Sequence, residues 1–348
     1  MVYGNLYNKY KGTDIYSQFK SEVDISDSLV EEDVIFESDN DTSLYVKALS
    51  LILSENNNFN IIFKESFSDR LVNQLKRLDP TSILSTIVDK FISILKALWN
   101  QFEALCIGIL SKAGAIKRYK NPILKLSEAI TYNAPHYNYT NIREDKSRTD
   151  FDTEINARYD LFLASLNSIK SLSSFGDIQS KIEEINTTFD DGVFYYDSLR
   201  GKIIGKEACS KENYAKELYK YFRDGQSEPI EEDIISVDTI KTKLNNLETT
   251  KNTKAISKTR ADVEKQANKM KAKYRSTKLT DYIGNNEKST EIESLYKKCI
   301  QLHITNTQEI CNTYLQYYAA KLDAAKEEYS NDIKILYRAA QEAVRKGL

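Results

Sequence analysis

The chain has 348 residues, with 49 Lys and Arg against 51 Asp and Glu, and this balance argues against a globally basic nucleic-acid-binding protein. It is 41% hydrophobic with only 11 Gly and 4 Pro, which permits a sizeable core and argues against collagen, glycine-loop enzymes and turn-rich β-sandwiches. The opening MVYGNLYNKYKG lacks the apolar stretch of a secretion signal. We therefore expect a reducing compartment, with four buried, unbridged cysteines: Cys106, Cys209, Cys299 and Cys311.

The first 41 residues form a predicted N-terminal arm, partly acidic. Residues 22–41 contain nine Asp and Glu and no Lys or Arg. Apolar residues then recur at spacings of three and four over 44–52 and 59–78, which predicts two helices joined at an Asn-rich turn.

The most apolar segment of the chain is 83–110. Its apolar positions cover about two-thirds of a helical wheel and include Trp99 and Phe102 as candidate interaction residues. Asp89, Lys96 and Glu103 interrupt it, so a membrane-spanning helix is disfavoured. We expect a central helix buried on most sides, with a surface amphipathic or partner-docking helix as the alternative. The Asn-Pro pair before residue 123 predicts a further short helix through Leu124, Leu126 and Ile130.

Four segments are predicted: the arm 1–41, a compact helical domain 42–132 around the apolar helix, a linker loop 133–150, and an elongated, coiled-coil-like helical domain 151–348. Helices are expected at 155–172, 178–189 and 214–222, whereas 193–209 is too irregular to assign. Substantial sheet would contradict this prediction, whereas small strands at 34–36 or near 193–204 would not. After Pro229 the chain has no Pro and two Gly, which predicts long helices near 234–247 and 291–346.

The closing helix carries a stripe of alternating large and small residues, including Leu322, Tyr329 and Leu336. Such a stripe suits close helix packing, so this helix is the candidate assembly element. Packing within the chain is the competing interpretation. The opposite face, which includes Lys321, is expected to meet water or a second neighbour.

No local motif predicts catalysis or a cofactor. The segment Gly201–Lys206 lacks the spacing and the Ser or Thr of a phosphate-binding loop. His136 and His303 have no partner at metal-ligand spacing, and His303 is expected to be a solvated helix residue. We expect no enzyme activity, no metal and no cofactor.

Ten Lys and Arg lie between Lys251 and Lys278, opposed only by Asp262 and Glu264. Three interpretations remain open: a solvated helix face, a sequence-independent contact to DNA phosphates, or pairing with an acidic segment such as 22–41. The candidate interaction residues of this segment are Lys265, Lys269, Lys273 and Arg275.

The fold class predicted is all-α, an elongated multi-helix bundle with long C-terminal helices. The Asn, Ile, Lys and Tyr bias, together with TSILSTIVDKFISILKALWNQF, KAGAIKRYKNPILKL and CNTYLQYYAAKLDAAKEEYSNDIKILYRAA, resembles virion structural proteins of large tailed bacteriophages. The resemblance implies a non-enzymatic, multi-copy head, neck or tail component, made in the host cytoplasm and located in the virion. Its partners would be other virion proteins and further copies of this chain, with non-specific DNA contact as an addition and no membrane. The alternatives are a membrane-active pore-former using 83–110 and a DNA-contacting packaging or scaffold protein using 251–278.

Overall fold

The computed structural model describes residues 80–132, 139–143, 146–171, 180, 183–184, 192–223, 233–247, 251–279, 281 and 290–348. The acidic segment 22–41, the predicted helices at 44–52 and 59–78, most of the predicted helix 178–189 and His136 lie outside these residues. The described part is all-α apart from one two-stranded sheet, which confirms the predicted fold class.

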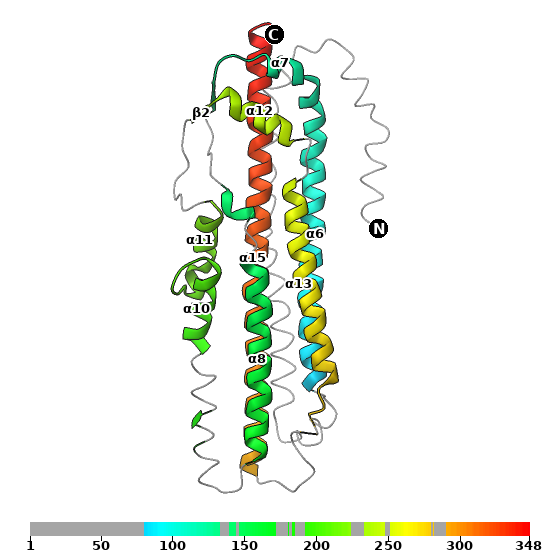
Figure 1. The fold of residues 1–348 in the computed structure, drawn as a ribbon, viewed down its shortest axis with the longest axis vertical. Helices are drawn as coiled ribbons and strands as arrows, with labels where there is room; N and C mark the ends of the chain where they lie inside the picture. Colours follow the sequence, from blue (N-terminus) through cyan, green and yellow to red (C-terminus); the bar gives the residue numbers. More distant parts are fainter. Residues whose placement is uncertain are drawn as a thin grey trace.

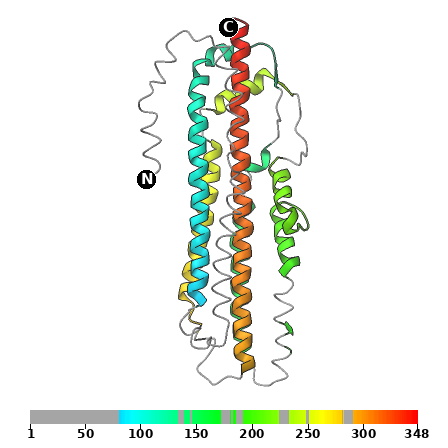
Figure 2. The same cartoon turned by 180° about the vertical axis from the view of Figure 1, so that it is seen from behind.

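Four long helices lie side by side in an elongated bundle (Figures 1 and 2). They are α6 (Pro80–Arg118), α8 (Lys146–Lys170), α13 (Lys251–Ser276) and α15 (Thr290–Arg345). At 1.5 Å per residue, the 56 residues of α15 span about 84 Å. Helix α8 runs antiparallel to α15, because Phe151 meets Tyr314 while Phe162 meets His303, farther toward the start of α15. Helix α13 is also antiparallel to α15, because Arg260 interacts with Tyr318 while Tyr274 meets His303.

Helix α6 confirms the prediction of a helix buried on most sides. Its apolar positions, from Leu84 through Trp99 to Phe102, are buried, whereas Thr86, Ser93 and other positions of the polar stripe are exposed. Pro80 occupies the first helical position, where the missing N–H has no intrahelical partner to lose.

The C-terminal end of α15 has a well-formed helix stop. Gly347 adopts a φ of 71°, a left-handed conformation that glycine reaches without steric cost. The Leu348 N–H donates to the Ala343 carbonyl at 3.0 Å and the Gly347 N–H donates to the Val344 carbonyl at 2.9 Å. These two bonds form a Schellman motif, which satisfies carbonyls that the helix leaves open.

Two hydrophobic clusters share α15. The main core joins α6, α8, α13 and α15 as far as Ala325, and includes α10 (Gly192–Ile203) and α11 (Lys211–Phe222). The C-terminal core surrounds Ile333–Ala343 of α15 with the end of α6, α7 (Lys120–Leu124), α12 (Val237–Asn246) and the sheet. The main core contains residues from both sides of the predicted boundary at 133–150. The division of the chain into two helical domains stays a prediction.

The sheet pairs β1 (Ile130–Tyr132) with β2 (Asp233–Ile235) in antiparallel register, with Ile130 opposite Ile235. Two elements differ from the sequence prediction here. Helix α7 ends at Leu124, so Ile130 lies in a strand and not in a helix. Residue 234 likewise lies in β2, and α12 begins after the N-cap Ser236, whose hydroxyl accepts from the Thr239 N–H at 3.2 Å.

Further differences concern α8 and α10. Helix α8 begins at Lys146, inside the predicted linker. Helix α10 occupies much of the segment that the sequence left unassigned, and the chain after it turns back closely against Gly201. A Cβ at Gly201 would lie 2.6 Å from the Ala208 Cα, so only glycine fits this approach.

Candidate interaction surface on helix α13

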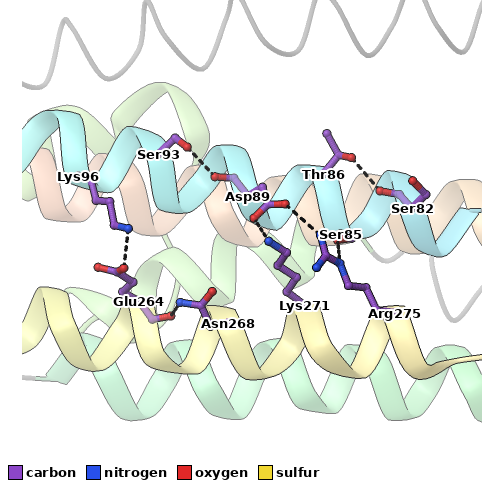
Figure 3. Close-up of polar contacts among 10 residues, drawn as sticks. All are labelled: Ser82, Ser85, Thr86, Asp89, Ser93, Lys96, Glu264, Asn268, Lys271 and Arg275. Atoms are coloured by element: carbon purple, nitrogen blue, oxygen red, sulfur yellow. Dashed lines mark hydrogen bonds and ion pairs between the residues drawn. The ribbon is translucent and has the colours of Figure 1, made fainter.

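The face of α13 toward α6 uses its charges within the chain (Figure 3). The Asp89 carboxylate accepts a hydrogen bond from Lys271 and lies 3.8 Å from Nη2 of Arg275. Arg275 Nε also donates to the Ser85 hydroxyl at 3.0 Å. Two of the basic residues of α13 thus hold α13 against α6.

A second ion pair crosses the same helix boundary with the opposite polarity. Lys96 of α6 lies 2.8 Å from Glu264 of α13. The backbone carbonyl of Glu264 accepts from the Asn268 side chain at 2.9 Å, as Figure 3 shows. Since both pairs are partly exposed, we expect each to fix helix register more than it adds to stability.

Apolar side chains and Trp99 lie beneath these pairs. Val263, Ala267 and Met270 of α13 are buried. Trp99 is 7% exposed, its ring centroid lies 5.6 Å from that of Phe102, and the Arg260 guanidinium carbon lies 5.4 Å from the Trp99 ring. The predicted burial of Trp99 in protein is confirmed, and both aromatic candidates are core residues in this chain.

The side of α13 toward α8 takes another predicted lysine. Lys273 donates a hydrogen bond to the Asn156 side-chain oxygen, and its Nζ lies 5.4 Å from the Tyr159 ring. The Tyr159 hydroxyl lies 2.6 Å from the Thr277 hydroxyl. These contacts make Lys273 a link between α13 and α8.

Three lysines of α13 take no part in these contacts: Lys258, Lys265 and Lys269, called here the lysine row. Spacings of seven and four residues put them on one face of the helix. All three are exposed, and none forms an ion pair with a described residue. The structure therefore separates the four predicted residues: Lys265 and Lys269 belong to the row, while Lys273 and Arg275 serve helix packing. The helical spacing itself would have revealed Lys258 as the third member.

The predicted assembly stripe of α15 lies largely within the chain. Leu322 and Leu336 are 0% exposed, in the main and C-terminal cores respectively. Tyr329 is partly buried, and burial raises the pKa of its hydroxyl. Lys321, expected on a face toward water, is 1% exposed, because helices surround α15 at this level.

Polar residues join α15 to its neighbours between the two cores. Arg223 donates from Nε to the Glu327 carboxylate at 2.9 Å and stacks over the Tyr219 ring. Asn331 donates to the Tyr139 hydroxyl at 3.2 Å. Burial, followed by the charge of Glu327, raises the pKa of Tyr139.

The prediction that His303 is solvated is wrong. Its side chain is 0% exposed, Nε2 lies 3.1 Å from the Tyr274 hydroxyl, and that hydroxyl also contacts Thr307 at 3.3 Å. Burial, with a smaller contribution from Arg158, lowers the pKa of His303 to about 3. At neutral pH the ring is uncharged and serves as a core residue.

The remaining chemistry predicted from sequence can be placed as well. All four cysteines are buried and unbridged, and burial raises the pKa of Cys106 to about 11 and that of Cys311 to about 12. Neutral thiols of this kind are poor nucleophiles. Within the described ranges, no group of three or more His, Cys, Asp or Glu side chains could hold a metal ion. Every helix in that part of the chain is too short or too polar to span a bilayer.

Comparisons with known proteins add no relative: no family model, no curated protein and no solved structure matches this chain.

Proposed function

We propose that this protein is a non-enzymatic structural component of a bacteriophage virion, placed in the head, neck or tail. The observation that carries the proposal is the single helix α15, which runs through both hydrophobic cores and makes one long, stiff axis. A rod of this kind suits a spacer or a strut better than it suits a small-molecule site. The compositional bias and the three segments that resemble phage virion proteins support the same assignment.

Contacts to partners would use the outer faces of the bundle. The apolar stripe of α15 is largely buried within the chain. Helix-mediated assembly must therefore use other surfaces, such as the exposed faces of α6 and α13. Other virion proteins and further copies of this chain are the proposed partners. The lysine row is one surface with charge to offer them.

Mass spectrometry of purified phage particles tests the assignment directly. The particles should come from the phage that encodes this chain, banded in a density gradient and washed in high salt. We expect the intact chain at a constant ratio to the capsid protein across the particle band. Its presence in the infected lysate and its absence from the particles would overturn the proposal.

Two further measurements address the competing functions. Dye release from liposomes, at protein concentrations that saturate binding, would favour a pore-former. Salt-sensitive retention on duplex DNA that depends on Lys258, Lys265 and Lys269 would favour a packaging or scaffold protein. For a structural component we expect neither.

A further inference from the structure

We infer that residues 22–41 of this chain bind across the lysine row of α13, as an acidic strap tethered to its own bundle. This inference does not depend on the virion assignment. It rests on the charge of the two segments, on the separation of α13's basic residues into paired and unpaired sets, and on the length of chain between them.

Charge complementarity is the first argument. The segment 22–41 carries nine carboxylates and no Lys or Arg, whereas the rest of the chain has 49 Lys and Arg against 42 Asp and Glu. This stretch of 20 residues therefore carries a net charge of −9, and the rest of the chain carries a net charge of +7. Its natural counterpart is a surface where positive charge is equally concentrated.

The structure identifies where on α13 such a surface lies. Lys271 pairs with Asp89, Arg275 lies beside the same carboxylate and donates to the Ser85 hydroxyl, and Lys273 contacts Asn156 and Tyr159. Lys258, Lys265 and Lys269 are exposed and have no acidic partner among the described residues. A ligand for α13 thus meets the row and not the whole basic segment.

The geometry allows the strap to reach. Lys258 and Lys269 lie 11 residues apart, about 17 Å along the helix. Thirty-eight residues separate Asp41 from Pro80, where α6 begins. Ser85, one turn and a half into α6, contacts Arg275 at the end of α13, so the tether starts beside the helix that carries the row. Even 38 residues at the helical rise cover about 57 Å, more than the distance along α13 to Lys258.

Tethering also explains why the acidic segment should bind the lysine row in preference to a separate polyanion. A covalently linked ligand whose linker can span the sites binds in an intramolecular step, so a free polyanion has to compete with its effective concentration. Three lysines offer little to duplex DNA, since each neutralised phosphate contributes only about one unit to the salt dependence of binding. The row is therefore better matched to a local acidic peptide than to nucleic acid.

Zero-length carbodiimide cross-linking of the full-length protein tests the inference, because it joins a lysine to a carboxylate only when the two are in contact. The pairs Lys271–Asp89 and Lys96–Glu264 provide internal positive controls. At about 50 mM salt we expect cross-links from Lys258, Lys265 or Lys269 to carboxylates of 22–41. At 1 M salt, where the screening length falls to about 3 Å, these cross-links should fall at least fivefold.

Two variants sharpen the test. Reversing the row with Lys258→Glu, Lys265→Glu and Lys269→Glu should increase protease cleavage within 22–41, a readout that does not depend on the lysine amines themselves. The matched control reverses three exposed lysines elsewhere, Lys117, Lys125 and Lys216, and should leave the strap cross-links unchanged. Circular dichroism confirms that both variants keep the helical fold.

Mixing unlabelled and ¹⁵N-labelled chains separates the two possible sources of the strap. Cross-links within chains of one label support the inference. Cross-links found only between labels would overturn it in favour of a neighbouring copy. Control cross-links without any link from the row to 22–41 would overturn it outright. If the same preparation also binds duplex DNA through the row, nucleic acid is the occupant instead.

Discussion

The imidazole of His303 stacks flat on the Phe162 ring, with centroids 4.2 Å apart and ring planes 5° from parallel. This pair joins α15 to α8 in the main core, and the Tyr274 hydroxyl brings α13 into the same contact. Nδ1 of His303 has no hydrogen-bond partner among the described residues. A proton on this ring would therefore be buried beside an aromatic face without a counter-charge, which explains the low pKa of about 3.

The buried histidine should make the bundle sensitive to acid. Above pH 6.5 the imidazole is neutral in the folded and unfolded states, so it has no effect on pH dependence. Between pH 6.5 and about 3 only the unfolded chain binds the proton, so stability falls as pH falls. The slope approaches about 1.4 kcal/mol per pH unit from this one group. Urea unfolding at pH 7.5, 6, 5 and 4.5 measures it.

His303→Phe should remove that slope while preserving the stack on Phe162. Tyr274→Phe is the matched control, because it deletes the hydroxyl contact but keeps the titrating ring, so its slope should equal that of the wild type. An unchanged pH dependence in His303→Phe would show that the acid sensitivity originates elsewhere.

Trp99 should contribute to stability through burial in protein. Replacing Trp99 with Ala in the tightly packed α6–α13 contact should cost about 3–5 kcal/mol of unfolding free energy. Trp99→Phe retains much of the apolar area and should cost clearly less. Because Trp99 is the only tryptophan, its fluorescence reports unfolding in the wild type, and circular dichroism serves for both variants. Unchanged melting together with lost liposome binding would instead indicate a lipid-facing role.

The sequence predicted those elements whose signal is local and periodic. Three-and-four spacing located α6 and α15, and the wide apolar face of α6 correctly indicated burial on most sides. The helix α10 was missed because Gly192 and Gly201 lower helix propensity, although Tyr196, Leu199 and Ile203 are buried at helical spacing. The strands have three residues each and pair across about a hundred residues of chain, so no local sequence pattern predicts them.

The candidate surface was predictable only in part. Composition located the basic segment, but the division of its charges depends on Asp89 of α6 and Asn156 of α8, which are distant in sequence. His303 illustrates the same limit: it lies one residue before Ile304 and three after Ile300, both buried. A polar residue at the edge of an apolar stripe is placed inside or outside by the neighbouring helices, which the spacing does not reveal.

Asp89 should contribute little to the free energy of unfolding, although it has two basic neighbours. Its side chain is 44% exposed and that of Arg275 is 62% exposed, so water screens both interactions. Asp89→Asn should lower stability by about 1 kcal/mol or less, and 1 M salt should reduce the difference further. A loss of several kcal/mol in chemical unfolding would mean that this pair anchors α13 and does more than set its register.

Arg223 should contribute more to stability than Asp89 does, because its side chain is 9% exposed and that of its partner Glu327 is 30% exposed. Arg223→Met keeps an apolar stem but removes the cationic partner of the Glu327 carboxylate, which retains its hydrogen bond with Tyr139, and this loss should cost about 1–3 kcal/mol. Lys206→Met breaks an ion pair with Glu217 in which the lysine is 51% exposed, and should cost less than about 1 kcal/mol. Equal losses in the two variants would show that burial of Arg223 adds nothing to its pairing.

The closing helix provides the last prediction, on stability and assembly together. Deleting residues 311–348 should prevent folding, because it removes the centre of the main core and all of the α15 contribution to the C-terminal core. A point change is therefore the sharper test. Leu322→Ala should cost about 2–5 kcal/mol by cavity formation.

The same variant should leave the mass in solution unchanged at temperatures where it stays folded, since Leu322 faces its own chain. Val344→Asp is the companion variant, at a position 39% exposed near the end of the same helix. It should preserve stability within about 0.5 kcal/mol. Multi-angle light scattering across a concentration series compares all three proteins. A fall in mass for Leu322→Ala without loss of stability would restore α15 as an intersubunit element and contradict its burial within one chain.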